Sequence, residues 1–398
     1  MNLHIKKRIV CAMSGGVDSS VSAALLKKKG YEVIGCFMRN WEKHEDDDST
    51  TKCTSDKDLE DAIYVSNQLN IRLHIVDFIK DYWTKVFEPF LDDYQHGLTP
   101  NPDILCNKYV KFNSLFKYCQ ERLDTTYLAT GHYAQVKQDK QGIKYYYKLM
   151  RGYDMKKDQS FFLCHLEKSV LPFIEFPIGG MMKSDVKRLA NELNLERISQ
   201  KTESMGLCFI GKRKFSSFIS QYISDNIGHI KSIETNEIIG EHYGLHRYTI
   251  GQRITPINKQ HKSSKPLFIA KKDLINNIIY AAPGTNHPAL FTKSFDTDIP
   301  HWINEIPCLL KETGQYQCDF RFQHKHRPLP VMLSLTAKNT LHVSLPIPIR
   351  AICPGQYAVF YNENEVLGAA RIIDSGTSLY DLQWTEPLIS SDLILNMC

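Results

Sequence analysis

A short apolar run near the start of the chain passes directly into small and polar residues, in the sequence Ile-Val-Cys-Ala-Met-Ser-Gly-Gly-Val-Asp-Ser-Ser at positions 9–20. The apolar part predicts a buried parallel strand. Gly15 and Gly16 allow a sharp turn and a close approach of the backbone to a ligand. Asp18 and the two serines after it begin a helical pattern, where unpaired N–H groups meet the positive end of the helix dipole. A strand, a turn and a helix start in this order predict an anion site, most simply for phosphate.

The composition is that of a globular protein, with 398 residues, 42% hydrophobic and 23% charged. This length predicts two or three domains, and no apolar run is long enough to span a membrane. A net charge of +5 permits an RNA partner without requiring one. The 11 cysteines include no C-x-x-C pair, which disfavours a structural zinc site and favours reactive thiols in a reducing compartment. Residues 1–8 are basic but lack the apolar core of a secretory signal.

Strand and helix patterns alternate over the first half of the chain, which predicts an α/β fold with a doubly wound parallel sheet. Gly30 is placed to end the first helix as a C-cap glycine. Short strand patterns replace this rhythm from about residue 215, and they predict a small β-rich module followed by a β-barrel or a β-sandwich, of which we expect the barrel. We therefore expect three domains, at 1–212, 213–288 and 289–398. The expected elements are strands from residue 9, at 32–37, 71–76, 127–130, 230–233, 248–250, 267–270, 278–281, 318–322, 331–335, 341–345 and 358–360, and helices from residue 17, at 56–69, 81–94 and 107–119.

Two cysteines stand out by their surroundings. Cys106 follows a loop fixed by two prolines and precedes the helix expected from Asn107, so the helix dipole and Lys108 would stabilise its thiolate. Asp103 in the same loop has the chemistry of a general base or an orienting group. Cys208 lies in a glycine-flanked segment. By itself it is as compatible with a structural role as with a functional one. Together with a phosphate loop, the pair suggests that one thiol carries a sulfane sulfur and the other resolves the product as a disulfide.

The Ser-Gly-Gly-x-Asp-Ser pattern resembles the PP-loop of the ATP pyrophosphatases, and neither a Walker loop nor G-x-G-x-x-G occurs. Further blocks, in the same order along nearly the whole chain, resemble the tRNA-specific 2-thiouridylase family. The blocks at 203–206 and 320–324 are more similar to its mitochondrial branch, although the second is less basic than the bacterial pattern. The blocks that carry the family resemblance are 37–41, 99–108, 130–133, 157–160, 206–211, 249–253 and 354–356.

The resemblance implies roles for individual residues. Cys106 would be the nucleophile, Cys208 the persulfide carrier, and Asp103 a further catalytic residue. The residues implied to contact ATP are Ala12, Met13, Ser14, Gly15, Gly16, Val17, Asp18, Ser19, Met38 and Gly131. Those implied to contact the target base are Asn101, Pro102 and Asp103, and those implied to contact the rest of the tRNA are His132, Lys157, Asp158, Gln159, Gln323, His324 and Gln356. Without the resemblance, His132 reads as a core histidine and Lys157 as a solvated surface lysine.

The implied reaction uses ATP and Mg²⁺ to adenylate the C2 oxygen of the wobble uridine, which must leave its stack. The Cys208 persulfide then supplies sulfur, and a Cys106–Cys208 disulfide remains. The implied partners are the tRNAs for Lys, Glu and Gln and a cysteine desulfurase or sulfur-relay protein. The implied location is the mitochondrial matrix, with the cytoplasm as the alternative.

Two other functions share part of this sequence pattern. Another ATP pyrophosphatase, forming an amide on a small metabolite, would need the phosphate loop but neither the cysteine pair nor the β-rich modules. A non-catalytic RNA-binding protein would tolerate the loss of Asp18, Cys106 and Cys208 together. The joint presence of these residues favours the thiolation enzyme.

Overall fold

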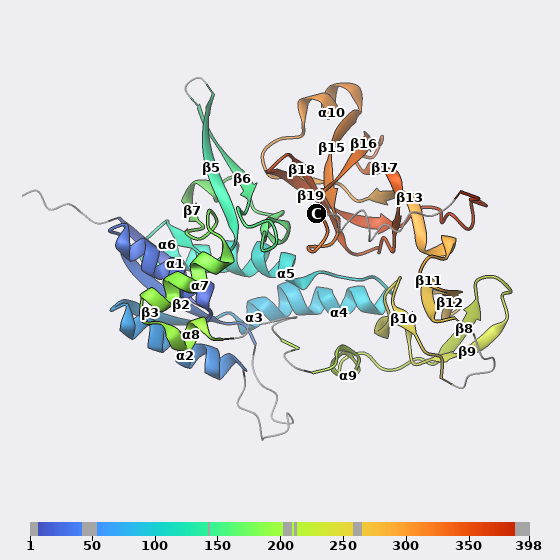
Figure 1. The fold of residues 1–398 in the computed structure, drawn as a ribbon, viewed down its shortest axis with the longest axis horizontal. Coiled ribbons are helices and arrows are strands. Elements are labelled where there is room, and N and C mark those ends of the chain that lie inside the picture. Colours follow the sequence, from blue (N-terminus) through green and yellow to red (C-terminus); the bar gives the residue numbers. More distant parts are fainter. Residues whose placement is uncertain are drawn as a thin grey trace, which may run out of the picture. The chain divides into compact units, whose positions relative to one another are not determined.

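The computed structural model describes residues 7–41, 54–141, 144–201, 209–210, 213–257 and 265–386 (Figure 1). The chain forms two compact units. The first unit comprises residues 1–87, 102–211 and 364–366, and the second comprises residues 88–101, 212–363 and 367–398. The expected three-domain boundaries stay a prediction. None of the helices within the described ranges is both long and apolar enough to cross a lipid bilayer.

The first unit is built on a parallel sheet, as the alternating pattern predicts. Its strands are β1 (Arg8–Ala12), β2 (Glu32–Arg39), β3 (Arg72–Asp77), β4 (Leu128–Ala129) and β7 (Ile174–Glu175), in the order β3-β2-β1-β4-β7. All four pairings are parallel. The centre of β1 is fully buried because helices cover the sheet, and this accounts for its continuous apolar sequence.

The helices of the first unit follow the predicted positions with two differences. Helix α1 (Val17–Lys28) ends in a Schellman motif, in which Gly30 has φ +89° and the Tyr31 N–H donates to Leu26 O at 3.2 Å. The expected helix at 107–119 begins earlier, at Pro102, and passes through α5 (Pro102–Leu105), the π-helical η2 (Cys106–Ser114) and α6 (Leu115–Arg122). The helix expected at 81–94 is divided into α3 (Ile79–Tyr82), the π-helical η1 (Trp83–Phe87) and α4 (Glu88–Gln95), of which α4 belongs to the second unit. The remaining helices of the first unit are α2 (Thr54–Gln68), α7 (Lys183–Glu192), α8 (Glu196–Ser199) and the 3₁₀ turns η3 (Ser160–Leu163) and η4 (Leu171–Phe173).

A β-hairpin that the sequence patterns did not predict projects from the first unit (Figure 1). It consists of β5 (Ala134–Gln141) and β6 (Lys144–Arg151), which pair along their whole length. We call this hairpin the arm. Its base is fixed by close backbone packing, because a Cβ on Gly179 would lie 1.7 Å from Ala134 O.

The second unit contains two β structures and so confirms the predicted change of rhythm. The smaller sheet has the order β10-β11-β12-β8-β9, and its core includes Ile230, Ile269 and Ile279. Its elements are β8 (Gly228–Ser232), β9 (Ile238–His242), β10 (Arg253–Ile254), β11 (Leu267–Asp273), β12 (Ile278–Pro283), α9 (Phe215–Ile219) and the 3₁₀ turn η5 (Leu245–Arg247). The strand expected at 248–250 is wrong, because these residues form a turn after η5.

The barrel begins at β13, after the 3₁₀ turn at Pro288–Leu290. Six strands are hydrogen-bonded in the order β13-β17-β16-β15-β18-β19, and a β13–β19 pairing closes the ring. Closure leaves a core that includes Phe295, Phe320 and Phe360. The elements are the 3₁₀ turn η6 (Pro288–Leu290), β13 (Phe291–Thr297), β14 (His301–Trp302), α10 (Cys308–Thr313), β15 (Gln315–Arg321), β16 (Leu329–Leu335), β17 (Leu341–Arg350), β18 (Tyr357–Asn362) and β19 (Glu365–Asp374).

Candidate active site

The strand order of the first unit sets the position of the site. The chain runs from β1 outward through β2 to β3, whereas β4 lies on the other side of β1. This reversal is a topological switch point, and ligands of open α/β sheets bind beside it at the carboxyl ends of the strands. Three predicted segments meet at that edge: the loop after β1, Met38 near the end of β2, and Gly131 just after β4.

The loop after β1 has the geometry of an anion cradle. Gly15 has φ +69°, and a Cβ there would lie 2.1 Å from the Asp58 carbonyl oxygen, so only glycine fits. Gly16 precedes the first turn of α1, where the Ser20 N–H is bonded to Gly16 O. Residues 17–19 form the first turn of α1, where N–H groups have no partner within the helix and can bind phosphate oxygens. The Ser19 hydroxyl oxygen accepts the Ser14 N–H at 3.1 Å and so fixes the loop across the turn.

The predicted ATP residues differ in what they can offer a ligand. Ser14 is exposed, and Ala12, Gly16, Asp18 and Met38 are half-buried. The side chains of Met13, Val17 and Ser19 are buried, so these residues present their backbone rather than their side chains.

Asp18 is the centre of a polar network in the loop. Lys183 Nζ donates to both Asp18 carboxylate oxygens at 2.8 Å, and the Tyr133 hydroxyl donates to Oδ1 at 2.8 Å. The Lys183 side chain is 10% exposed, so water screens this ion pair only weakly. Gly131 supports the same turn, because a Cβ there would lie 2.6 Å from Ser19 N.

The sequence reasoning missed Lys183 and Tyr133 as site residues. Tyr133 lies in the block at 130–133 that resembles the family, but the sequence pattern indicates no role for it. Lys183 is the first residue of α7, where the helix dipole favours acidic side chains over basic ones. A lysine in that position is the one sequence signal that could have pointed to a buried acidic partner.

A second missed lysine supports the loop from behind. Lys201 Nζ donates to Gly15 O at 3.2 Å, to Asp58 at 2.6 Å and to Asp61 at 2.7 Å. Burial lowers the pKa of Lys201, but hydrogen bonds and charge from both carboxylates outweigh it and raise the pKa above its ordinary value. Arg197 also pairs with Asp61 at 2.7 Å. The charged lysine therefore links the loop backbone to α2.

Cys106 lies inside a helix rather than before one, which corrects the sequence prediction. It follows the four residues of α5 and starts the π-helical segment η2, and it is 6% exposed. The dipole argument for its thiolate is therefore weaker, because that effect falls off within the first turn. Lys108 Nζ lies over the ring of the neighbouring Tyr109, 5.1 Å from the ring centre. The neighbouring Asn107 amide donates to Phe162 O at 2.9 Å and anchors this turn.

Lys111 connects two residues that the sequence singled out. Burial raises the pKa of Asp103, and the charge of Lys111 opposes that shift. Burial also lowers the pKa of His132 well below its usual value, and the same Lys111 charge adds to the effect. Because π-helical turns bring residues i and i+5 together, Lys111 follows Cys106 by one turn of η2. It was missed because an ordinary helical period would not align the two residues.

Cys208 falls outside the described residues, so its distance from Cys106 stays a prediction. The next residue, Phe209, is described and is 2% exposed. Its ring centre lies 5.5 Å from that of Trp41, 6.0 Å from that of Tyr82 and 5.3 Å from that of Phe87. Trp41 belongs to the block at 37–41 that carries the family resemblance, so aromatic packing explains part of that block.

Several residues predicted to contact tRNA are engaged inside the protein. His132 is 8% exposed, its Nδ1 lies 2.6 Å from Thr130 Oγ1, and its ring packs on Phe112 and Phe176. This is the environment of a core histidine, so the burial does not support a direct contact with RNA. The same holds for Asp158, which is fully buried and accepts hydrogen bonds from Arg151 Nε and the Gly152 N–H, both at 3.0 Å.

Gln159 and Gln356 hold backbone groups. The Gln159 side-chain oxygen accepts the Tyr133 N–H at 3.0 Å. The Gln356 amide donates to Thr99 O at 2.8 Å, within the second unit. That amide therefore fixes the chain just before Asn101.

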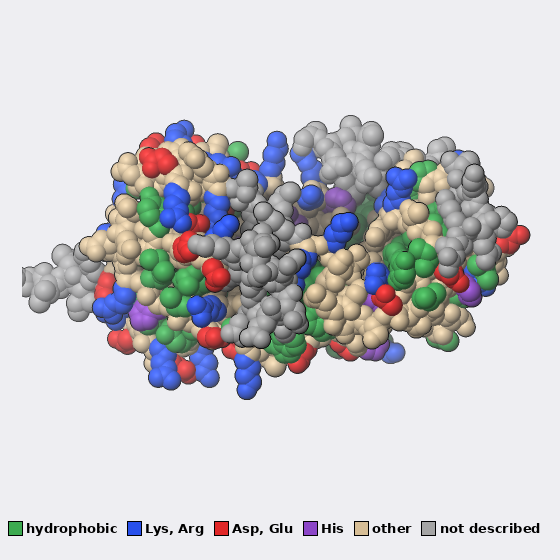
Figure 2. All heavy atoms as spheres, turned by 90° about the horizontal axis from the view of Figure 1, so that it is seen from below, with side chains coloured by type: hydrophobic (Ala, Val, Ile, Leu, Met, Phe, Trp, Pro, Cys, Tyr) green, Lys and Arg blue, Asp and Glu red, His purple; other side chains and the backbone are tan. Residues whose placement is uncertain are grey.

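The remaining predicted tRNA residues differ in exposure. Lys157 and His324 are half-buried, whereas Gln323 is exposed in a loop of the barrel with Lys325 and Arg327. Acidic and basic side chains are intermixed on the face drawn in Figure 2, in line with the modest net charge. Asn101 and Asp103 are half-buried and Pro102 is buried.

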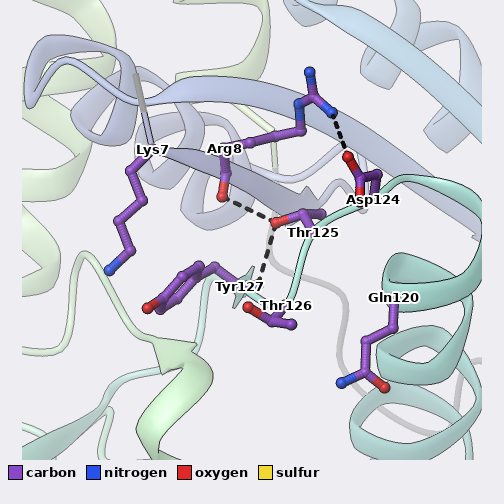
Figure 3. A pocket seen from close by; sticks show the side chains of 7 residues that line it. All are labelled: Lys7, Arg8, Gln120, Asp124, Thr125, Thr126 and Tyr127. Atoms are coloured by element: carbon purple, nitrogen blue, oxygen red, sulfur yellow. Dashed lines mark hydrogen bonds and ion pairs between the residues drawn. The ribbon is translucent and has the colours of Figure 1, made fainter. Parts of the chain in front are cut away.

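A hollow of about 320 Å³ lies at the opposite end of β1 from the loop (Figure 3). Its lining includes Lys7, Arg8, Asp124 and Tyr127, and the Thr125 hydroxyl donates to Arg8 O at 2.9 Å. It opens at the amino ends of the strands, where this fold class does not bind its nucleotide. The hollow therefore does not have the position expected of the nucleotide site.

The loop, its support by Asp18 and Lys183, and its place at the switch point of a parallel sheet define a nucleotide-binding protein of the PP-loop ATP pyrophosphatase class. Three family models match the chain: the tRNA methyl transferase HUP domain over residues 7–212, the tRNA methyl transferase PRC-barrel domain over 216–283, and the aminomethyltransferase beta-barrel domain over 292–372.

Curated relatives match nearly the full length. Mitochondrial tRNA-specific 2-thiouridylase 1 of Drosophila melanogaster is 42% identical over 374 residues, covering 93% of this chain and 94% of the relative. The Homo sapiens protein of the same name is 40% identical, covering 95% of this chain and 93% of the relative. The tRNA-specific 2-thiouridylase MnmA of Proteus mirabilis is 40% identical, covering 94% and 98%. The chain belongs to the tRNA-specific 2-thiouridylase family.

Proposed function

We propose that this chain is an ATP-dependent tRNA sulfurtransferase that converts the wobble uridine of tRNA to 2-thiouridine. The observation that carries the proposal is the loop at 13–19, which leads into the first turn of α1 and whose Asp18 is held by Lys183 at 2.8 Å. Membership of the 2-thiouridylase family supplies the substrate and reaction class.

Activation is the first task of the site. The C2 carbonyl of uridine is a poor electrophile and must be activated before sulfur can attack it. In the activation step its oxygen attacks the α-phosphorus of ATP, and pyrophosphate leaves. The N–H groups at the start of α1 stabilise the negative charge that develops on the leaving phosphates. The C2 oxygen then departs as AMP in the next step.

Sulfur transfer follows at the activated carbon. The terminal sulfur of a Cys208 persulfide attacks C2, and the C–O bond to AMP breaks. The Cys106 thiolate then attacks the Cys208 sulfur, and the electron pair of the S–S bond leaves with the sulfur on the base. The product is 2-thiouridine, and a dithiol reductant must reopen the resulting Cys106–Cys208 disulfide.

The site offers few protein side chains that could coordinate Mg²⁺. The described residues contain no group of three or more His, Cys, Asp or Glu side chains arranged to hold a metal. Asp18 is the acidic side chain in the loop, and a Mg²⁺ there would take most of its ligands from phosphate and water. The ion would neutralise phosphate charge during activation.

The partners and location follow from the family. We propose the tRNAs for Lys, Glu and Gln as substrates and a cysteine desulfurase or sulfur-relay protein as donor. We propose the mitochondrial matrix as the location, since the fly and human relatives are named mitochondrial enzymes, although a bacterial relative is about as similar.

The test is reconstitution with purified protein. Unmodified tRNA, ATP, Mg²⁺, a dithiol reductant and a cysteine desulfurase with L-cysteine should yield 2-thiouridine detectable by mass spectrometry of the digested RNA. Cys208→Ser should abolish the product but keep tRNA binding and pyrophosphate release, whereas Asp18→Ala should impair pyrophosphate release. Absence of 2-thiouridine from every tRNA tested, with desulfurase activity verified, would reject the proposed function.

A further inference from the structure

We infer that one face of the arm is a contact surface for RNA nucleotides outside the target base. We call the side chains of Gln138, Lys140, Tyr145 and Tyr147 the arm face. The inference rests on the proposed function, because it takes tRNA as the ligand of the first unit.

The strand register defines the arm face. Lys140 pairs directly with Tyr145, and Gln138 pairs directly with Tyr147. Direct cross-strand partners project to the same side of an antiparallel hairpin, and alternate residues share that side. Lys140 Nζ lies 5.8 Å from the centre of the Tyr145 ring, and this ring is 58% exposed. An exposed aromatic ring beside a cation is the arrangement that stacks bases and neutralises phosphate.

The opposite face of the arm is already engaged within the protein. Lys148 on that side pairs with Asp139 at 3.4 Å and with Glu365 at 3.2 Å. Lys168 lies 5.7 Å from the centre of the Tyr146 ring on the same side. The Lys148 cation is thus balanced by two carboxylates, whereas no acidic side chain within the described ranges forms an ion pair with Lys140. Positive charge therefore remains available on the arm face.

The root of the arm is fixed to the nucleotide loop. Tyr133, which immediately precedes β5, donates its hydroxyl to Asp18 at 2.8 Å. Gln135 Nε2 donates to Arg151 O at 2.9 Å and joins the two strands at the root. Arg151 in turn pairs with the fully buried Asp158 at 3.0 Å. The arm therefore starts at the rim of the site where the base reacts.

The length of the arm determines how far Tyr145 lies from its root. Tyr145 is six residues from the end of β6, a reach of roughly 20 Å at about 3.4 Å per residue. A two-stranded hairpin has little stability of its own, and exposed tyrosine near its tip adds nothing to the core. A ligand that stacks on the ring and pairs with the lysine accounts for this composition. The nucleic-acid substrate of the proposed function supplies both a π-face for the ring and a phosphate for the lysine.

The experiment measures binding of unmodified tRNA to the full-length protein by fluorescence anisotropy between 50 and 200 mM salt, roughly the range over which phosphate contacts are lost. Tyr145→Ala should weaken binding about fivefold or more without changing the salt dependence. Lys140→Ala should weaken binding and reduce the slope of log K against log salt by about 0.7 to 0.9. Lys137→Ala is the matched control, because Lys137 is exposed on the same strand but faces the other side.

The outcomes distinguish a failure of the proposed function from a failure of the arm inference. If the parent protein neither binds nor thiolates tRNA, the proposed function fails. If the parent thiolates tRNA but both arm-face variants bind it with parental affinity and salt slope, the arm inference is overturned. The arm inference is also overturned if these variants bind tRNA normally and lose only sulfur uptake from the donor protein, since the arm would then bind protein. A Lys137→Ala effect as large as that of Lys140→Ala would show that the contact is not confined to the arm face.

Discussion

Substituting Gly131 by alanine should damage the nucleotide loop from outside it. The added Cβ would lie 2.6 Å from Ser19 N and 2.7 Å from the Asp18 carbonyl carbon. Both are backbone atoms in the first turn of α1, so no side chain can rotate away. Moving from 2.6 Å to the 3.4 Å of an ordinary contact requires a displacement of about 0.8 Å. A shift of that size is enough to break the Tyr133–Asp18 hydrogen bond, now 2.8 Å long.

The energetic scale follows from the displacement. Overpacking by one methyl group costs about 1–3 kcal/mol when the surroundings must move. If this strain falls on the loop, ATP affinity should drop by about 5- to 150-fold. Isothermal titration calorimetry with ATP and Mg²⁺ measures the affinity, and thermal unfolding measures how much of the strain the fold absorbs.

Gly180→Ala is the matched control for this substitution. A Cβ at Gly180 would have only Gln135 Oε1 nearby, at 4.0 Å. This variant should bind ATP and unfold like the parent protein. Parental ATP affinity and thermal stability in Gly131→Ala would refute the claim that close packing on α1 shapes the loop.

Three further predictions concern other residues of the two units. Lys183→Met leaves the Asp18 carboxylate with one fewer partner; we expect a loss of about 2 kcal/mol in unfolding free energy in urea and slower ATP-dependent pyrophosphate release, and Lys183→Arg should restore part of each. Burial lowers the pKa of Lys272 to about 8 from 10.5, so the unfolded chain binds more protons between these values and stability should rise with pH across that window. Lys272→Met should remove this rise in urea titrations at pH 8 and pH 10. Gln356→Leu should lower the thiolation rate and keep tRNA affinity if the amide holds Thr99, whereas a parallel loss of tRNA affinity would indicate a direct RNA contact.

The sequence predicted the nucleotide loop well because local rules determine its geometry. A buried strand, a glycine with φ +69° and a helix start are each encoded within a few residues, and Gly30 ends the same helix as expected. The parallel sheet was also predictable, since each strand is bounded by helical patterns. These features depend on neighbours in the chain and little on distant contacts.

The start of the helix that carries Cys106 was missed for a local reason. The two prolines suggested a loop, but proline is favoured at the first helical position and asparagine just before it. Asn101 and Pro102 show that arrangement, and α5 begins at Pro102. The π-helical continuation in η2 could not be predicted, because π-helical turns are rare and apolar spacing indicates an ordinary helix.

The cations of the site were missed for a different reason. Lys183 lies 165 residues from Asp18, and Lys201 lies 186 residues from Gly15. No local pattern links residues so far apart, and only the packing of α7 on α1 and of α8 on α7 brings them to the loop. The arm was missed because its charged and aromatic residues serve neither a core nor a regular apolar face.

The second unit has a task beyond any contact with RNA, since it holds the chain that enters the Cys106 helix. Lys272 Nζ donates to Gly97 O at 2.8 Å and to Tyr248 O at 2.6 Å. The Thr99 N–H donates to Pro354 O at 2.9 Å, and Gly355 lies so close that a Cβ there would be 2.7 Å from Thr99 N. The small sheet and the barrel thus both fasten the loop that ends at Asn101.

These contacts of Thr99 with Pro354 and Gly355 connect two blocks that are far apart in the sequence, at 99–108 and 354–356. Moving a lysine out of water is costly, and the Lys272 ammonium group offsets this cost by satisfying Gly97 O in this loop and Tyr248 O after η5. A change in the small sheet or the barrel that moved Gly97 or Thr99 would therefore displace the residues leading to Cys106. If Cys106 acts as proposed, substitutions in the β modules that loosen Gly97 or Thr99 should lower the sulfur-transfer rate even where tRNA affinity is unchanged.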